Sequence, residues 1–267
     1  MTMMTQDIES GAVPPDRVVP LTGGHNFRDI GGYATTDGRM TAWRRIYRSG
    51  TMAELNETDH AILNDLGLRV ICDFRTTEER TRRPSRLPAA ESFEIWARDY
   101  DHSGANLIDV MRRPGATVAS SREQLIKLYH TLAYEQAPAL RELFLRIAQG
   151  PLPLVFHCAA GKDRTGVAAA LLLDLLSVPR DTILEDYTLT DRFFERGCRL
   201  VREDPIGNRL ADVDPQIWQP MMRADPAYLA SMFDTLEKRH GSARDFLREE
   251  IGVDKDMGET IRERLLV

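Results

Sequence analysis

Residues 152–176, LPLVFHCAAGKDRTGVAAALLLDLL, constrain the fold of this chain more than any other stretch. An apolar run ends at His157, a polar loop with glycine, lysine, aspartate and arginine follows, and a second apolar run begins. The first run, Leu152–Phe156, is short and follows Gly150, which predicts a buried strand. The second run, Thr165–Leu176, is apolar on nearly every side, which predicts a buried helix. Two buried elements joined by a polar loop indicate an α/β protein with its chemistry in that loop.

The loop between the predicted strand and helix is suited to binding an oxyanion. The first amides of a helix have no intrahelical acceptors, and the helix dipole adds positive character at the same end. A curled loop would direct its N–H groups around a tetrahedral anion. Arg164 can bind two oxygens of that anion through its planar guanidinium. The residues predicted to surround the anion are Ala159, Ala160, Gly161, Lys162, Asp163, Arg164 and Thr165.

Cys158 stands at the end of the predicted strand, at the bottom of this anion site. Amide donors, the helix dipole and Arg164 all favour the charged thiolate, which is the nucleophilic form of cysteine. The alternative is an ordinary buried cysteine, and the charged loop residues beside Cys158 disfavour it. Cys72 and Cys198 are instead interpreted as buried or incidental thiols, with a resolving role for Cys72 as the alternative.

The rest of the chain predicts one α/β domain over residues 21–267, preceded by a flexible polar arm over residues 1–20. Strands are expected in RRIYRS, in LRVICDFR and around residues 93–97. Helices are expected in LNETDHAILNDLG, in SSREQLIKLYHTL with a capping box from Ser120 to Glu123, and in PALRELFLRIAQG. Further helices are expected over 181–196, 226–239, 242–251 and 256–266. This alternation predicts a central mixed sheet with helices on both sides.

Composition limits the partners of the chain. The formal net charge is −6 over 267 residues, so there is no global basic field and nucleic acid is not an expected partner. The longest apolar run, residues 166–176, is too short to cross a bilayer, so no stable membrane insertion is expected. Three widely spaced cysteines and an N-terminus without an apolar signal segment predict a cytoplasmic location, with leaderless export left open. The sequence does not indicate an oligomeric state.

The spacing of Cys158, five residues and Arg164 resembles the CX5R loop of cysteine-dependent phosphatases. HCAAGKDRTG, together with NFRDIGGY, YRSG and DFRTTEER, is similar to the bacterial tyrosine phosphatases of the mycobacterial protein tyrosine phosphatase B type. The resemblance extends from about residue 22 to the C-terminus. It implies a CX5R phosphatase fold and hydrolysis of phosphomonoesters without a metal or other cofactor, because Arg164 and the loop amides supply the positive charge.

The same resemblance implies roles for the loop residues. Cys158 would attack phosphorus and form a phosphocysteine, while Arg164 and the loop amides stabilise the equatorial oxygens. Thr165 would hydrogen-bond the sulfur, and His157 would orient the loop through backbone contacts. Ser49, in YRSG, is a further supporting residue that could approach the phosphate.

The identity of the general acid is left between two aspartates. No aspartate occurs between Asp109 and Asp163, so the loop residue Asp163 is the leading candidate, as in the family that the chain resembles. Asp73 matches a family aspartate thought to assist at the site. It could orient Asp163 or Arg164, share a proton with Asp163, or be a structural partner of a nearby arginine.

The expected substrate is phosphotyrosine in a protein, with phosphoserine, phosphothreonine and phosphoinositides as additions. Lys162 favours phosphoinositides, because related loops with a lysine at this position accompany that activity. A dedicated phosphoinositide phosphatase is therefore one alternative. A non-catalytic protein that binds phosphorylated partners is the other.

Two further segments have both a structural and a functional interpretation. Residues of about 181–240 are either core or a helical lid that covers the pocket and protects Cys158, with Trp218, Met221 and Met222 on its inner face. The arginines at 75, 80, 82, 83 and 86 are predicted as a solvated face interleaved with Glu78 and Glu79, with a rim that steers anionic substrates as the alternative.

Overall fold

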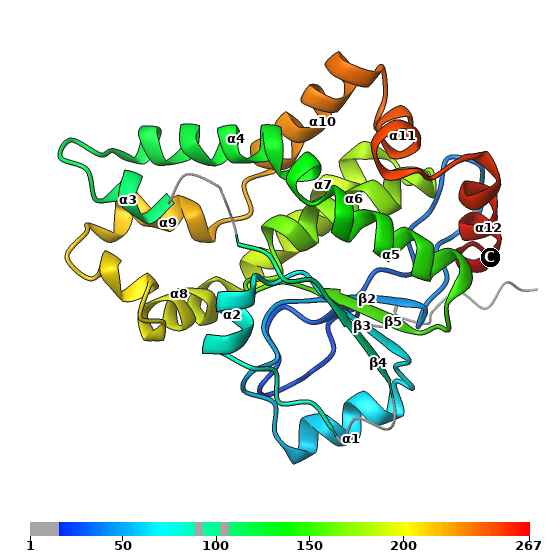
Figure 1. The fold of residues 1–267 in the computed structure, drawn as a ribbon, viewed down its shortest axis with the longest axis horizontal. Helices are drawn as coiled ribbons and strands as arrows, with labels where there is room; N and C mark the ends of the chain where they lie inside the picture. Colours follow the sequence, from blue (N-terminus) through cyan, green and yellow to red (C-terminus); the bar gives the residue numbers. More distant parts are fainter. Residues whose placement is uncertain (1–15, 89–92, 102–106) are drawn as a thin grey trace, which may run out of the picture.

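The computed structural model describes residues 16–88, 93–101 and 107–267 of the chain, which form a five-stranded sheet with several helices on one face and one helix, α1 (Glu57–Asp65), on the other (Figure 1). The strands lie in the order β1-β2-β5-β3-β4, with β1 antiparallel to β2 and all other pairs parallel. The mixed α/β sheet predicted from the sequence is therefore confirmed. The strands are β1 (Arg28–Asp29), β2 (Ile46–Ser49), β3 (Val70–Asp73), β4 (Glu94–Ala97) and β5 (Leu154–His157).

The described chain also contains twelve α-helices. They are α1 (Glu57–Asp65), α2 (Thr77–Arg82), α3 (Leu107–Met111), α4 (Val118–Glu135), α5 (Ala137–Gln149), α6 (Asp163–Leu175), α7 (Arg180–Thr188), α8 (Phe194–Glu203), α9 (Pro215–Met222), α10 (Pro226–His240), α11 (Ala243–Phe246) and α12 (Lys255–Leu265). Two 3₁₀ turns, η1 (Leu189–Phe193) and η2 (Gly207–Leu210), and one π-helical turn, η3 (Leu247–Ile251), complete them.

The strands bury side chains on both faces of the sheet. Along β5, Leu154 and Phe156 belong to the large core shared with α4, α5, α6 and α10, whereas Val155 belongs to a smaller core shared with α1. This alternation follows from the period of two in a strand. Helix α6 lies in the middle of the large core, and ten of its residues are buried, because it is packed between the sheet and the outer helices. A nearly uniform apolar helix is stable only in such a place.

The boundaries of several elements differ from the sequence prediction for local reasons. β5 begins at Leu154 rather than Leu152, because Pro153 has no N–H to donate to the sheet. α6 begins at Asp163, since the Gly166 amide already donates to the Lys162 carbonyl at 2.7 Å. α4 begins at Val118, two residues before Ser120. The prediction of a capping box from Ser120 to Glu123 is therefore wrong.

The capping box of α4 lies three residues earlier than predicted. The Thr117 hydroxyl accepts from the Ser120 amide at 3.1 Å, and the Ser120 hydroxyl accepts from the Thr117 amide at 2.9 Å. The caps of α1 match the prediction: Asn56 forms the capping box and Gly67, with φ of 65°, follows the helix. Short polar side chains near a helix start compete for the cap, which is why such positions shift easily.

The first described residues belong to the folded body. The guanidinium of Arg17 donates to the Gly31 carbonyl at 2.9 Å and lies 4.0 Å above the centre of the Tyr33 ring. The prediction of a flexible arm over 1–20 therefore does not hold for residues 16–20, and residues 1–15 lie outside the described chain.

A third apolar core lies beside the sheet. It joins α3, α8, η2 and α9 through Ile108, Met111, Phe194, Cys198, Leu210, Trp218 and Met222. Figure 1 shows these elements together at one end of the molecule, next to α2. By contrast, α7 and α10 belong to the large core, α7 through Ile183 and Tyr187 and α10 through Leu229 and Phe233. We call the α3–α8–η2–α9 group the side lobe.

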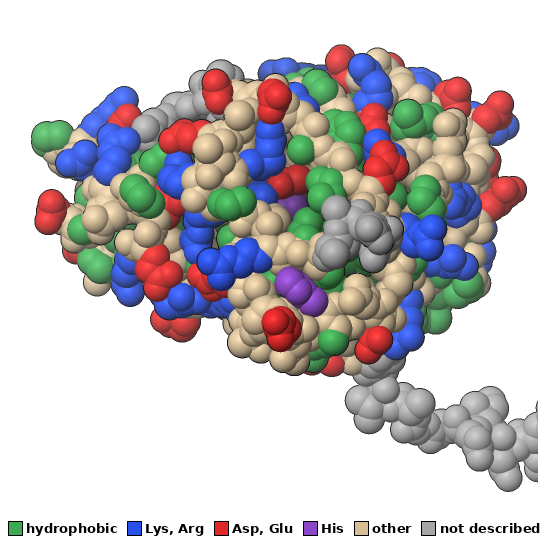
Figure 2. Space-filling model, turned by 60° about the horizontal axis from the view of Figure 1, so that its bottom comes forward, with side chains coloured by type: hydrophobic (Ala, Val, Ile, Leu, Met, Phe, Trp, Pro, Cys, Tyr) green, Lys and Arg blue, Asp and Glu red, His purple; other side chains and the backbone are tan. Residues whose placement is uncertain are grey.

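The surface mixes both signs of charge. In the view of Figure 2, acidic and basic side chains are interspersed, with no wide field of one sign on that face. Among the described helices, none is both long enough and apolar enough to span a bilayer.

Candidate active site

The loop from Cys158 to Lys162 joins the end of β5 to the start of α6, and its carbonyl groups are turned away from its centre. The Ala159 carbonyl accepts from the Thr51 amide at 2.8 Å. The Gly161 carbonyl accepts from Asn26 Nδ2 at 2.9 Å and from an Arg48 guanidinium nitrogen at 3.0 Å. Because the carbonyls point outward, the loop amides and the first amides of α6 are left for an anion.

Gly161 allows this loop to lie directly against the end of β2. Its φ is 66°, and a Cβ atom there would lie 2.5 Å from the Gly50 nitrogen. A larger residue would both strain the backbone and force the loop away from β2. The glycine at this position is therefore required by packing as well as by conformation.

Cys158 is buried at the base of the loop, with 2% of its surface exposed. Two residues predicted to support Cys158, Thr165 and Ser49, make other contacts than expected. The Thr165 hydroxyl donates to the Ser49 carbonyl at 3.4 Å rather than to the sulfur. The Ser49 side chain is fully buried, and its hydroxyl donates to the His25 carbonyl at 3.3 Å.

Arg164 is held from one side by Glu79, a residue that the sequence analysis placed on a solvated face. Two guanidinium nitrogens of Arg164 bind the two carboxylate oxygens of Glu79 at 2.7 and 2.8 Å, and one of them also donates to the Phe74 carbonyl at 3.0 Å. Among the described residues, Nε of Arg164 has no acceptor. The edge formed by Nε and the second NH2 hydrogen is therefore left to bind an anion.

The start of α2 explains how Glu79 reaches Arg164. Glu79 completes a capping box with Thr76: one carboxylate oxygen accepts from the Thr76 amide at 2.8 Å. Burial would raise the pKa of Glu79, but Arg164 and this amide lower it below its usual value. Burial alone would lower the pKa of Arg164, whereas Glu79 and the nearby Cys158 sulfur raise it well above its usual value. Both groups are therefore charged at neutral pH.

Asp73 is bound to Arg75, not to Asp163 or Arg164. The Arg75 guanidinium lies 2.7 Å from one Asp73 oxygen, and His157 Nε2 lies 3.5 Å from the same oxygen. Burial raises the pKa of Asp73, but His157 and Arg75 outweigh it and lower the value to about 2. Burial lowers the pKa of His157 to about 4, so its ring is neutral at pH 7. Neutral His157 and ionised Asp73 form a fixed support under the loop.

Asp163 and Lys162 lie on the opposite side of the loop. One oxygen of Asp163, Oδ1, accepts from the Tyr129 hydroxyl at 2.9 Å and lies 3.0 Å from Lys162 Nζ. Lys162 is 2% exposed, donates to the Arg223 carbonyl at 3.2 Å and lies 5.5 Å from the centre of the Tyr228 ring. The ammonium group is therefore engaged beneath the start of α10.

A buried cluster of charges behind the loop was also missed by the sequence analysis. Asp186 of α7 accepts from Arg48 at 2.5 Å, from Arg28 at 3.2 Å and from the Tyr33 hydroxyl at 2.9 Å. Arg28 also donates to Asn26. Burial would raise the pKa of Asp186, but the two arginines hold it well below its usual value. Because Arg48 and Asn26 bind the Gly161 carbonyl, this cluster fixes the back of the loop.

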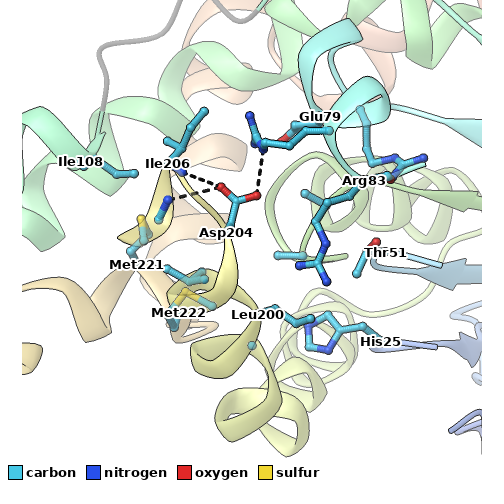
Figure 3. Close-up of a pocket in the computed structure, with 17 residues that line it drawn as sticks. His25, Thr51, Glu79, Arg83, Ile108, Leu200, Asp204, Ile206, Met221 and Met222 are labelled. Atoms are coloured by element: carbon cyan, nitrogen blue, oxygen red, sulfur yellow. Dashed lines mark hydrogen bonds and ion pairs between the residues drawn. The ribbon is translucent and has the colours of Figure 1, made fainter. Parts of the chain in front are cut away.

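A cavity of about 210 Å³ opens beside the loop, between α2 and the side lobe. Figure 3 shows Leu200, Ile206, Met221 and Met222 on one side and Glu79 and Arg83 on the other. Ala159 and Ala160 of the loop form part of its wall. Arg82 reaches across and pairs with Asp204 at 3.0 Å.

The arginines after β3 are not a simple solvated face. Arg75 is 2% exposed, and Arg82 and Arg83 line the cavity while bound to Asp204 and Glu54. The prediction of a solvated face is wrong for these three arginines, because the segment folds into α2, which turns one side towards the loop, whereas Arg86 and Glu78 are exposed.

The chain is similar to known phosphatases over most of its length. Residues 19–267 match the family model described as the tyrosine phosphatase family. A protein of Cupriavidus necator named as a candidate tyrosine-protein phosphatase is 32% identical over 231 residues, covering 86% of this chain and 82% of that protein. The triple specificity protein phosphatase PtpB of Mycobacterium tuberculosis is 27% identical over 263 residues, covering 86% of this chain and 92% of that protein. A tyrosine-protein phosphatase of Nostoc commune is 31% identical over 152 residues, covering 55% of this chain and 49% of that protein.

Proposed function

The chain belongs to the tyrosine phosphatase family, and from that premise we propose that it hydrolyses phosphotyrosine through a phosphocysteine on Cys158. It is a protein-tyrosine phosphatase by its similarity to named relatives. The observation that carries the proposed mechanism is the loop itself: its carbonyls are bound from outside, and a guanidinium fixed by Glu79 lies opposite the buried cysteine.

The first proposed step forms a bond between the Cys158 sulfur and phosphorus while the bond from phosphorus to the tyrosine oxygen breaks. The free edge of Arg164 and the loop amides bind the three equatorial oxygens and stabilise the charge on them. In the second step a water oxygen attacks phosphorus, the sulfur leaves as the thiolate, and inorganic phosphate is released. Buried donors that are already oriented stabilise this charge without reorganisation.

Asp163 is the proposed general acid. Its second oxygen, Oδ2, has no partner among the described residues and can give a proton to the leaving oxygen, then accept one from the attacking water. Asp73 is the weaker candidate for three reasons: it is buried against Arg75, its pKa is lowered to about 2, and it touches neither Asp163 nor Arg164. We assign Asp73 to holding His157 and Arg75.

Phosphoserine, phosphothreonine and phosphoinositides are proposed as additional substrates. The relative named as a triple specificity phosphatase and Lys162 both favour a wider range. The contacts of Lys162 with Asp163 and the Arg223 carbonyl oppose phosphoinositides, since a second phosphate would have to displace both. Phosphotyrosine therefore stays the leading substrate.

The proposed lid is the side lobe, which keeps α8, η2 and α9 of residues 181–240, adds α3 and excludes α7 and α10. Those two helices are built into the large core, whereas the lobe meets the cavity through Met222 and Leu200. Trp218 and Met222 are buried in the lobe, and Met221 and Met222 line the cavity. Ion pairs from Arg196 and Arg199 to Glu54, each at 3.2 Å, would hold the lid closed.

A cytoplasmic location is also proposed, with leaderless export as the alternative. It is supported by three free, buried cysteines, since a nucleophilic thiol needs a reducing compartment.

Initial rates on three substrates test the proposed specificity. At equal concentration, kcat/KM for a phosphotyrosine peptide is expected to exceed that for a matched phosphoserine peptide and for a soluble phosphoinositide by about tenfold or more. The apolar side chains that line one side of the cavity, among them Leu200, Met221 and Met222, can stabilise an aromatic ring, and a difference of about 1.4 kcal/mol gives this factor. A preference for the phosphoinositide would favour the lipid phosphatase alternative, and no turnover of any aryl phosphate would favour a non-catalytic binding protein.

Replacing Glu79 with glutamine is expected to lower kcat/KM on a phosphotyrosine peptide by about 10- to 100-fold, because small misplacements of a catalytic group have effects of that size. Glutamine keeps the shape of the side chain but removes the charge that fixes Arg164. Glu78→Gln is the matched control, since Glu78 is the adjacent residue and pairs with Arg82 at 2.8 Å with two-thirds of its side chain exposed. Equal rates in the two variants would contradict a role for Glu79 in orienting Arg164.

A further inference from the structure

We propose that Tyr129, held in turn by Tyr187, is a positioning residue for Asp163 and determines which carboxylate oxygen faces the leaving group. The inference rests on the proposed role of Asp163 as the acid. It concerns two tyrosines on α4 and α7 that the mechanism above does not use.

The direction of each hydrogen bond in this cluster follows from counting protons. The Tyr129 hydroxyl donates its one proton to Asp163 Oδ1 at 2.9 Å. It also lies 2.6 Å from the Tyr187 hydroxyl. Because Tyr129 has no second proton, Tyr187 must be the donor in that contact. The proton of Tyr187 thus orients the Tyr129 oxygen, and the proton of Tyr129 orients the carboxyl group.

The two hydroxyls act as fixed donors rather than as proton carriers. Burial, and then the nearby Asp163 carboxylate, raise the pKa of both tyrosines well above the usual value. Both phenols therefore stay protonated at any working pH. A group that never ionises cannot release a proton to the reaction, but it can hold an acceptor in one orientation.

The contacts of Asp163 fix the carboxyl group in an asymmetric way. Tyr129 and Lys162 both bind Oδ1, at 2.9 and 3.0 Å. Among the described residues, Oδ2 has no partner. Loss of the Tyr129 hydroxyl would leave Oδ1 with Lys162 alone, whose ammonium is shared with the Arg223 carbonyl, and the carboxyl group could then rotate about its Cβ–Cγ bond.

The packing around Tyr187 shows that this cluster depends on the first turn of α6. A Cβ atom at Gly166 would lie 3.0 Å from two carbon atoms of the Tyr187 ring, so the glycine lets the ring lie against the helix. The rings of Tyr129 and Tyr187 meet edge to face with centres 6.2 Å apart, and the Tyr129 ring also packs on Tyr228 at 5.9 Å. Three packed rings restrict the hydroxyl positions to one arrangement.

A comparison of leaving groups tests the proposal. Phenyl phosphate needs a proton on its leaving oxygen, whereas 4-nitrophenyl phosphate has a stable leaving anion and needs little help. Tyr129→Phe is expected to reduce kcat/KM for phenyl phosphate about tenfold more than for 4-nitrophenyl phosphate, the size of one lost hydrogen bond to a charged group. Asp163→Asn should show the same selectivity with a loss of about 10²- to 10⁴-fold. The double variant should match Asp163→Asn alone, since both act through one group.

Tyr134→Phe is the matched control. Tyr134 lies on the same helix, and its hydroxyl binds His240 at 3.0 Å, away from the loop. The Tyr134→Phe variant loses a comparable hydrogen bond and should keep the leaving-group dependence of the wild type. Tyr187→Phe should show a smaller loss of the same selective kind, and it provides a second variant if Tyr129→Phe is poorly folded.

The outcomes separate this inference from the proposed function. Equal losses on both substrates in Tyr129→Phe and Tyr187→Phe, with a selective loss in Asp163→Asn, would overturn the positioning role alone. A further selective loss when Tyr129→Phe is added to Asp163→Asn would also overturn it. An unselective Asp163→Asn would overturn the acid assignment and this inference with it.

Discussion

The Cys158→Ser variant is expected to lose turnover of a phosphotyrosine peptide, with kcat reduced by about 10⁵-fold or more, as when a covalent nucleophile is removed. A serine hydroxyl stays protonated at neutral pH and is a weak nucleophile without an adjacent base. His157, the nearest histidine in sequence, faces Asp73 and is fixed there. The loop amides and Arg164 are unchanged, so the variant should still bind tungstate, a tetrahedral oxyanion, with near wild-type affinity by calorimetry.

Cys198→Ser controls for the loss of a thiol as such. Cys198 is also buried, but it belongs to the core of the side lobe and not to the loop. The Cys198→Ser variant should retain most of the wild-type turnover of the phosphotyrosine peptide. Full activity in Cys158→Ser would exclude Cys158 as the nucleophile. Loss of tungstate binding with an unchanged unfolding midpoint would mean that the loop is not the phosphate site.

The parts of the site that lie within one short stretch of chain were predictable from the sequence. The strand, the loop and the helix that join at Cys158 and Arg164 are contiguous, so apolar patterning alone locates them. Four of the five strands were predictable for a similar reason, because each lies in a short stretch with apolar or strand-forming residues, such as VICD in β3. For these four strands the errors were limited to a few residues at the ends. β1, Arg28–Asp29, consists of two charged residues and was not predicted, since it has no apolar pattern.

The residues that hold the loop in place could not be predicted with the same means. Glu79 is 85 positions before Arg164, and Asp186 is 138 positions after Arg48, so only the tertiary fold brings each pair together. Sequence reasoning treats a charged residue as solvated unless a pattern says otherwise. One local signal was present for Glu79: Thr76 and Glu79 have capping-box spacing, which indicates a helix start directly after β3. Asp186 had no such signal within α7.

Replacing Asp186 with asparagine is expected to lower the free energy of unfolding by about 3–5 kcal/mol, the cost of breaking a buried ion pair. The side chains of Arg28 and Arg48 are almost fully buried, and both bind this carboxylate. Asparagine has nearly the same volume, so the change isolates the charge: two guanidinium groups would lie in the core without a counter-charge. Urea denaturation at pH 7 measures the difference.

Asp37→Asn is the matched control because Asp37 also binds two arginines, Arg39 at 2.6 Å and Arg262 at 2.5 Å, but it does so at the surface. Water and salt screen that cluster, so Asp37→Asn should lower the free energy of unfolding much less than Asp186→Asn does. The pKa of Asp186 is held well below its usual value. The contribution of the ionised carboxylate to the free energy of unfolding is therefore present above the ordinary aspartate pKa of about 4 and is lost as the pH falls further. The difference between Asp186→Asn and wild type should therefore be constant from neutral pH down to about pH 5.

The Asp186→Asn variant also tests whether the buried cluster supports phosphate binding. Arg48 bridges Asp186 and the Gly161 carbonyl, so without the carboxylate it should no longer hold that carbonyl outward. At a temperature where the variant is still folded, its affinity for tungstate is expected to fall about tenfold, as for one misplaced donor group in a preorganised site. Asp37→Asn should bind tungstate like the wild type. If Asp186→Asn were destabilised but bound tungstate normally, the cluster would stabilise the fold alone, and the loop would keep its shape through Asn26, Thr51 and Gly50.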